Sequence, residues 1–218
     1  MGRAWWRLRA ACGLVGPAAF TAAWITSTLR QQGYSVAEEH LSGLAAPDAR
    51  DPAIMIGGFL ALGACTTVFG SALESALGGR RRAGVAPALM RGAGIATIAA
   101  GLLRRDRMLL HPVEALGGGE SWHNHGHDLA SLAIYVALIA APPLLARRLR
   151  DDPRWSGLAP AAVATSAATT ALLLLFWSRV VEPWNGIVQR TAVTVPLAAM
   201  AALATQLLHE DPPPAARR

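Results

Sequence analysis

Residues 121–131, SWHNHGHDLAS, hold three of the six histidines of the chain and an aspartate. His123 and His127 are four residues apart, so on a helix they share one face. Two imidazoles on one helix face suit a divalent metal such as zinc, although the HExxH pattern of helical zinc enzymes is missing. This pair is therefore the predicted metal site. Further ligands would have to come from His40, Glu39, Asp106 or Asp128.

Acid/base chemistry without a metal is the alternative, carried by Glu39, His40 and Asp128. Histidine titrates near neutrality, and a neighbouring carboxylate sets its tautomer, as proton transfer requires. The competing structural interpretation places Glu39 and His40 on the solvated face of a surface helix. It makes His125 a loop residue, and His123 and His127 interfacial side chains bonded to carboxylates or water. The predicted catalytic residues are Glu39, His40, Asp106, His127 and Asp128.

A second group of side chains is suited to holding a lipid-like substrate. Arg104 follows an apolar stretch, where a guanidinium suits a phosphate headgroup or a phosphorylated lipid, and where ordinary snorkelling explains it equally well. Trp122 and Trp184 fit an aromatic belt at the membrane boundary first and the wall of a lipid-facing cavity second. The predicted substrate-binding residues are Arg104, Trp122, Trp184, Gln189 and Arg190.

The composition of the whole chain indicates a membrane protein. Of the 218 residues, 53% are hydrophobic and 16% charged, and the apolar residues come in long blocks. All 20 basic residues are arginine, which we attribute to the composition of a GC-rich bacterial genome. The net charge of +6 and the pI near 10.8 are explained by orientation signals and lipid headgroups. No basic stripe with interleaved aromatic residues indicates nucleic acid.

Six apolar spans predict an all-α, six-helix transmembrane bundle, forming one domain over residues 1–218 with a short tail at about 209–218. Each span is long enough to cross the hydrocarbon core. The spans cover about residues 10–29, 52–77, 87–103, 123–145, 157–181 and 187–208. More arginines flank the side of the N-terminus, which predicts both termini in the cytoplasm and the protein in a bacterial cytoplasmic membrane. The predicted site then faces outward.

Two finer features concern the ends of the first span. Trp5 and Trp6 are expected to anchor its beginning at the membrane interface. After its end, Ser35 followed by Glu38 fits a capping box and predicts a short helix lying on the surface. Cys12 and Cys65 fall inside apolar spans, where we expect them to behave as small hydrophobic residues.

Four motifs together resemble the bacterial six-helix integral membrane family catalogued as domain of unknown function 998. They are GYSVAEEHLSGLAAPDA, LLRRDR, SWHNHGHDLAS and WNGIVQR, in this order along the chain. The resemblance implies a six-helix bundle with the motif positions assembled at one membrane face, and it brings no activity. By this matching, the motif positions are Glu39, His40, Ser42, Asp106, His127, Asp128, Gln189 and Arg190.

The leading hypothesis is an enzyme that acts on a lipid or isoprenoid by metal-assisted or acid/base chemistry. The alternative is a non-enzymatic protein that binds a lipid or small ligand or supports a partner. The layout is also similar to membrane hydrolases of the alkaline ceramidase type and, more distantly, to integral membrane terpene cyclases. Haem binding is disfavoured because the histidines crowd one surface. Transport is disfavoured because no internal repeat is evident. The oligomeric state and the partner stay open.

Overall fold

The computed structural model describes residues 2–79, 83–108, 121–178 and 180–210. The predicted tail beyond Glu210 therefore lies outside the described residues. The described part is helical, without a strand. Its α-helices are α1 (Arg3–Arg30), α2 (Pro52–Ala76), α4 (Ala86–Leu102), α5 (Trp122–Arg150), α6 (Ala159–Trp177) and α7 (Asn185–His209). Short 3-10 helices lie at η1 (Leu41–Ala45), η3 (Ser156–Leu158) and η4 (Glu182–Trp184).

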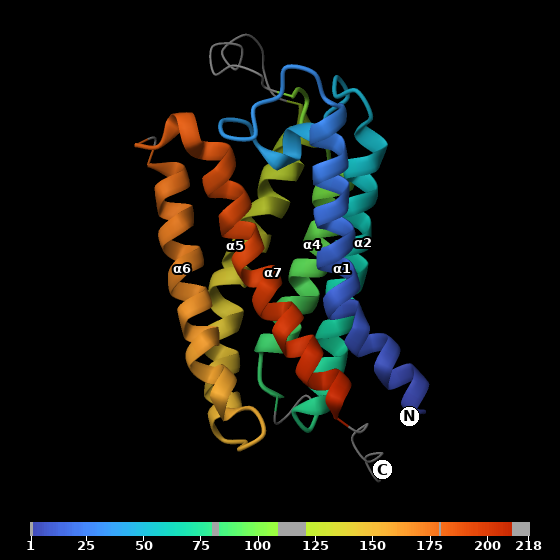
Figure 1. Cartoon of the computed structure of the whole chain (residues 1–218), viewed down its shortest axis with the longest axis vertical. Helices are drawn as coiled ribbons and strands as arrows, with labels where there is room; N and C mark the ends of the chain where they lie inside the picture. The colour runs from blue at the N-terminus through green and yellow to red at the C-terminus, as the bar shows by residue number, and fades with distance from the viewer. Residues whose placement is uncertain (1, 80–82, 109–120, 179, 211–218) are drawn as a thin grey trace.

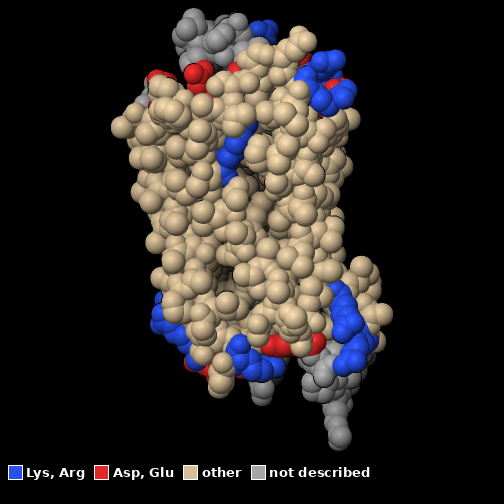
Figure 2. All heavy atoms as spheres, in the orientation of Figure 1, with Lys and Arg blue, Asp and Glu red and all other residues tan. Residues whose placement is uncertain are grey.

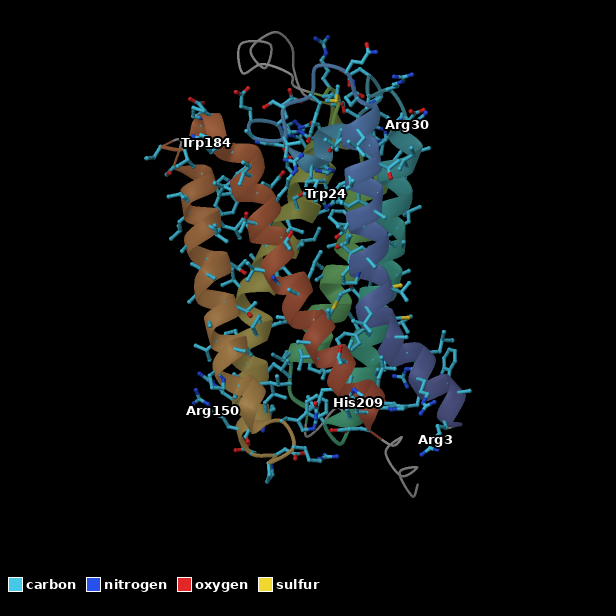
Figure 3. All side chains as sticks on the ribbon, in the orientation of Figure 1. Arg3, Trp24, Arg30, Arg150, Trp184 and His209 are labelled. Atoms are coloured by element: carbon cyan, nitrogen blue, oxygen red, sulfur yellow. The ribbon has the colours of Figure 1, made fainter. Side chains whose placement is uncertain are left out.

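These α-helices form a closed ring (Figure 1). Each packs on the next in chain order, and α7 returns to pack on α1. Both termini lie at the same end of the ring, which we call the termini end. Trp24, Arg30 and Trp184 lie toward the other end, the cap end, whereas Arg3, Arg150 and His209 lie at the termini end (Figure 3). Residues 31–51 and the beginnings of α5 and α7 therefore meet at the cap end.

The chain is a multi-pass membrane protein by its helices. Among the described residues, five helices are long and apolar enough to cross a membrane, and α4, with 17 residues, is shorter. At about 1.5 Å per residue α4 extends over about 26 Å, close to the roughly 30 Å of a hydrocarbon core. Figure 2 shows a broad band with little charge between two charged ends, as a bilayer requires. The all-α membrane fold predicted from the sequence is confirmed.

Glycines bring α1, α2 and α4 into close contact. A Cβ atom on Gly63 would lie 2.5 Å from the carbonyl oxygen of Gly94, and one on Gly94 would lie equally close to the oxygen of Gly63. A Cβ on Gly16 would lie 2.7 Å from Cβ of Cys65. Small residues that let helix backbones approach are the usual basis of helix association in membranes. This half of the ring is therefore tightly packed.

The segment after α1 differs from the predicted surface helix. Residues 36–39 form turns, and the following 3-10 helix η1 is buried throughout. Glu39, rather than Glu38, bonds back to Ser35: the backbone N–H of Ser35 donates to Glu39 Oε1 at 3.3 Å. The prediction of a surface helix was wrong because Leu41, Leu44 and Ala45 supply enough apolar surface to insert the segment into the ring.

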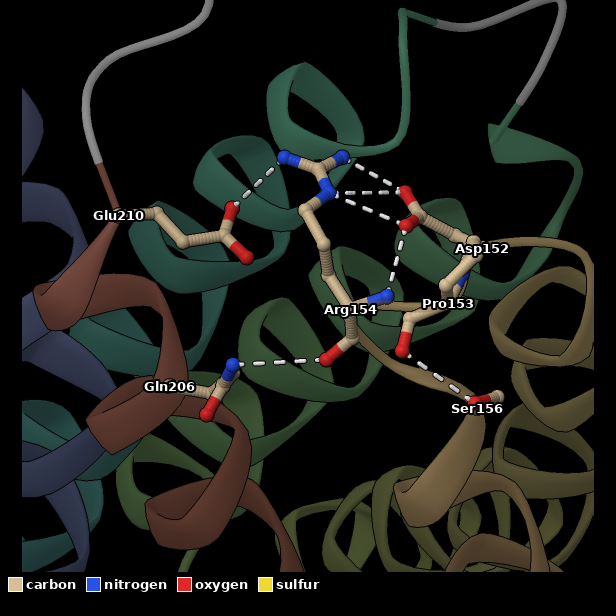
Figure 4. Close-up of polar contacts among 6 residues, drawn as sticks. All are labelled: Asp152, Pro153, Arg154, Ser156, Gln206 and Glu210. Atoms are coloured by element: carbon tan, nitrogen blue, oxygen red, sulfur yellow. Dashed lines mark hydrogen bonds and ion pairs between the residues drawn. The ribbon is translucent and has the colours of Figure 1, made fainter.

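The termini end is closed by the loop between α5 and α6 (Figure 4). Arg154 contacts Asp152 through Nε and Nη2 and reaches Glu210 Oε2 at 3.4 Å, while Gln206 Nε2 donates to the Arg154 carbonyl at 3.5 Å. Trp155, beside this network, is fully buried. The loop therefore fastens α5 and α6 to the end of α7.

Trp6 also belongs to this closure. Its indole Nε1 donates to the carbonyl of Glu210 at 3.2 Å, and only 1% of its surface is exposed. The prediction that both Trp5 and Trp6 are interfacial anchors was therefore wrong for Trp6, because α1 begins at Arg3 and turns Trp6 inward against the end of α7. Trp5 is 54% exposed, as an interfacial residue is expected to be.

Candidate functional site

The ring encloses a cavity of about 150 Å³ that reaches from the cap end toward the termini end. Along α5 its lining extends from His127 to Leu145, about 27 Å at the helical rise. The deep wall is apolar, with Phe20, Leu62 and Leu203 among its residues. Figure 2 shows the hollowed face of the ring within its band of little charge, with a blue arginine side chain above the hollow. The cavity is therefore long, narrow and hydrophobic over most of its length.

Polar side chains line the cavity mainly toward the cap end. Each comes from an element that begins or ends there, within a few turns of the helix end. All are uncharged in the forms that the contacts below support. They are Ser42 of η1, Thr97 of α4, His127, Ser131 and Tyr135 of α5, and Gln189 of α7. Two threonines, Thr66 of α2 and Thr165 of α6, line the cavity farther from the cap end.

His127 is held in one tautomer. Its Nδ1 lies 2.8 Å from the carbonyl oxygen of Ala100, and because a carbonyl only accepts, Nδ1 carries the hydrogen. In the neutral ring Nε2 is then a hydrogen-bond acceptor. The side chain is 3% exposed, and its ring packs edge-on against Phe59 at 6.4 Å. The structure thus places a pre-oriented acceptor in the cavity wall.

Gln189 links three elements at the cap end. Its Oε1 accepts from the backbone N–H of Leu41 at 2.8 Å, and its Nε2 donates to the Tyr135 hydroxyl at 3.4 Å. Tyr135 in turn packs edge-on against Trp177 of α6, with ring centroids 5.8 Å apart. Since the Tyr135 oxygen accepts from Gln189, its own hydrogen is available to another acceptor. Gln189 therefore orients Tyr135 while it holds η1 in place.

Arg190, the next residue, faces the chain segment that covers the ring. Its Nη1 donates to the carbonyls of Val36 at 3.0 Å, Glu39 at 2.7 Å and Gly186 at 2.9 Å. Its Nη2 donates to the Tyr34 hydroxyl. The guanidinium also lies 5.5 Å from the ring centroid of Trp24 and 5.4 Å from that of Tyr34, which is cation–π geometry. Through these contacts the Arg190 side chain holds residues 34–39 against α7.

Gly186 makes this docking possible. A Cβ atom there would lie 2.5 Å from the carbonyl oxygen of Val36, 2.6 Å from that of Glu39 and 2.9 Å from that of Ala37. The backbone N–H of Ile187 donates to the Ala37 carbonyl at 3.1 Å. The first turn of α7 thus touches the backbone of the covering segment directly. Only a glycine leaves room for that approach.

His40 is kept neutral beside two arginines. Arg105 Nη1 lies 3.3 Å from His40 Nδ1, and because a guanidinium only donates, Nδ1 is the acceptor. Its ring packs against Phe176 at 5.0 Å. The pKa of His40 is lowered from 6.5 to about 4, chiefly by burial and in addition by the positive charges of Arg105 and Arg190. Glu39, its neighbour, is turned to Ser35.

Asp106 organises the beginning of α5. It accepts from the backbone N–H of Ser121 at 2.7 Å and from the Ser121 hydroxyl, whose oxygen accepts from the N–H of Asn124 at 3.3 Å. These hydrogen bonds from Ser121 lower the pKa of Asp106. Asn124 Nδ2 also donates to Asp128 Oδ2 at 3.2 Å, and Asp128 is exposed. Asp106 and Asp128 thus contact the first turns of α5.

The remaining predicted residues lie on the surface or its edge. His123 is exposed and stacks on Trp122 with ring centroids 3.7 Å apart, while His127 is buried. Trp122 is 68% exposed and Trp184 57% exposed. Arg104 is partly exposed. Within the described ranges, no group of three or more His, Cys, Asp or Glu side chains is placed to hold a metal. The zinc site shared by His123 and His127 stays a prediction.

Two of the predicted catalytic and substrate-binding residues, His127 and Gln189, therefore line the cavity, and so does the motif residue Ser42. Sequence reasoning missed Tyr135 as a site residue. A signal was present, because Tyr135 is one of only two tyrosines and interrupts an otherwise apolar span two turns beyond His127. Gly186 was also missed, since its role depends on backbone far away in sequence.

Comparison with known proteins gives a family and no activity. The family model described as "Protein of unknown function (DUF998)" matches residues 14–206, which include every cavity residue named above. No curated protein and no solved structure matches the chain.

Proposed function

Because the chain belongs to the DUF998 family, whose description states no activity, we propose its function from the geometry: it binds a lipid or isoprenoid molecule inside the ring. The molecule lies with its chain in the apolar depth of the cavity and its polar end near His127 and Gln189. The observation that carries this proposal is the cavity itself, long and apolar with polar side chains mainly toward one end. Such a pocket suits an amphipathic ligand.

The polarity of the cavity also sets the direction of the ligand. With both termini in the cytoplasm of a bacterium, the cap end faces outward, and the ligand's polar end lies at the outer surface of the cytoplasmic membrane. Its chain then points toward the middle of the bilayer, where apolar groups are most stable. A ligand of this kind reaches the cavity from the surrounding lipid.

A second candidate function is an enzyme that acts on the same ligand by acid/base chemistry. The fixed tautomer of His127 favours it, because a buried imidazole with Nδ1 bonded to the Ala100 carbonyl leaves Nε2 to accept a proton. The cyclase alternative has less support, since the described lining of the cavity contains no carboxylate to protonate an isoprenoid. A metal-assisted reaction would use His127 Nε2 as a ligand, with its Nδ1 already oriented by a carbonyl.

Two neighbouring alanines of α7 offer a matched test of binding. Ala199 lines the cavity, whereas Ala198 is exposed on the outside of the ring. The wild-type protein, Ala199→Phe and Ala198→Phe would be purified in a mild detergent, and their bound lipids identified by native mass spectrometry. We expect one co-purifying molecule in wild type and Ala198→Phe that is lost from Ala199→Phe. Equal occupancy in all three proteins would refute a ligand in the cavity.

The enzymatic candidate is tested with the molecule so identified. Wild-type protein and His127→Gln, which keeps a polar side chain at this position, would be incubated with it in nanodiscs. Turnover by wild type and its loss in His127→Gln, with binding retained, supports acid/base catalysis. Binding without turnover by wild type supports the non-enzymatic role.

A further inference from the structure

We infer that the cavity selects a ligand whose polar end is uncharged and donates a hydrogen bond, namely a long-chain or isoprenoid alcohol. This inference rests on the proposed binding function and names its ligand class. It replaces the phosphorylated lipid that the arginines near the cap end suggest from sequence.

No charged side chain is part of the described lining. Its polar members are serine, threonine, tyrosine, glutamine and histidine, and arginine, aspartate and glutamate are absent from it. An ionised phosphate or carboxylate in such a wall would lose its hydration without gaining a counter-charge. Burial of an unpaired ion is far more costly than burial of a hydroxyl that finds a partner. The cavity therefore disfavours anionic head groups.

Two arginines at the cap end contact the segment that covers the ring. Arg190 follows Gln189 on α7, yet its Nη1 donates to three backbone carbonyls and its Nη2 to Tyr34. Arg105 contacts His40, outside the lining. Neither guanidinium belongs to the described lining, so a phosphate inside the cavity would gain no arginine partner there. Both cations instead hold the segment that covers the ring.

The polar end offers what a hydroxyl needs. Because Nδ1 of His127 donates to the Ala100 carbonyl, Nε2 is a hydrogen-bond acceptor, and a ligand group that donates a hydrogen bond fits it. The Tyr135 hydroxyl, whose oxygen accepts from Gln189, offers a hydrogen about 12 Å farther along the same helix. A primary alcohol can donate to His127 Nε2 or accept from Tyr135 through one oxygen atom. A chain of methylenes or isoprene units behind it matches the narrow apolar depth.

The test compares head groups on one chain. Farnesol and farnesyl phosphate share their hydrocarbon and differ in the polar end, and hexadecanol and hexadecyl phosphate form a second such pair. Binding of each to wild-type protein in nanodiscs would be measured by native mass spectrometry, with empty nanodiscs as the background. We expect each alcohol to bind at least tenfold more tightly than its phosphate. This comparison needs no variant.

The donor to His127 is tested by substitution on α5. His127→Leu removes the acceptor, and His123→Leu is the matched control, because His123 is exposed on the same helix. We expect alcohol binding to weaken roughly tenfold in His127→Leu, the loss of one hydrogen bond, and to stay unchanged in His123→Leu. Thermal unfolding of both variants verifies that they are folded.

The outcomes separate the two proposals. A phosphate that binds as tightly as its alcohol, or more tightly, overturns the uncharged head group and leaves the binding function standing. Binding of neither pair overturns both proposals. Preference for the alcohols in wild type supports the ligand class even where His127→Leu fails to fold.

Discussion

Gly186→Ala should separate residues 36–39, part of the segment that covers the ring, from the first turn of α7. The new methyl group would lie 2.5, 2.6 and 2.9 Å from the carbonyl oxygens of Val36, Glu39 and Ala37. All three are backbone atoms, so none can move aside as a side chain does. Two of them, those of Val36 and Glu39, also accept from Arg190 Nη1. Relief of the clash therefore draws residues 36–39 away from both the helix and the guanidinium.

The expected loss follows from these contacts. Overpacking of this kind costs about 1–3 kcal/mol, and each weakened hydrogen bond to a charged donor adds part of about 1.5–3 kcal/mol. The gain in helix propensity from glycine to alanine returns about 0.5–1 kcal/mol. We expect a net decrease of about 3 kcal/mol in the free energy of unfolding. For a chain of this length, that lowers Tm by about 6–12 °C.

Thermal unfolding in detergent, followed by tryptophan fluorescence, measures the shift. Gly57→Ala is the matched control, because no atom lies within 4 Å of a Cβ placed on this exposed helical glycine. Its Tm should stay level or rise by a few degrees through the gain in helix propensity. If Gly186→Ala unfolds at or above the wild-type Tm, the close contact between α7 and residues 36–39 is refuted.

Four further predictions follow from the other contacts. Arg190→Lys should lower the free energy of unfolding by about 3 kcal/mol or more, because an ammonium cannot reproduce the planar set of hydrogen bonds to three carbonyls and Tyr34. The control Arg107→Lys, at an exposed position, should change Tm little. Since the folded-state pKa of His40 is lowered to about 4, stability should fall as pH drops from about 6.5 toward 4, by at most about 1.4 kcal/mol per pH unit; unfolding of wild type and His40→Gln across that range checks this, and equal slopes would contradict it. At the termini end, Trp155→Ala should cost about 3–5 kcal/mol and Arg154→Gln less than about 1 kcal/mol, because Trp155 is fully buried and Arg154 is 58% exposed; similar Tm shifts would refute the ranking. Zinc shared by His123 and His127 should disappear from both His123→Ala and His127→Ala by elemental analysis, and zinc kept by His123→Ala would exclude a shared site.

The helices were predictable because their apolar blocks are as long as a bilayer is thick. The end of the ring that carries His127 and Gln189 was predictable too, since each lies within two turns of a polar loop. The burial of η1 was not, because Leu41 and Leu44 form too short a run to stand out in a hydropathy pattern. The contacts of Arg190 join residues about 150 positions apart, and no local pattern encodes such a pairing.

Glycine is distributed unequally around the ring that encloses the cavity. The glycines of α2 and α4, such as Gly63 and Gly94, bring those helices together and leave no space between them. In α5 and α7 the glycines lie only near the cap end, at Gly126 and Gly186, while α6 contains none. Deeper in the membrane, α5 and α7 each contain a proline that lines the cavity. Pro142 and Pro196 lack the N–H that would bond the preceding turn. The ring is thus closely packed between α2 and α4, whereas on α5 and α7 prolines within the helices line the cavity in which we propose that the ligand chain lies.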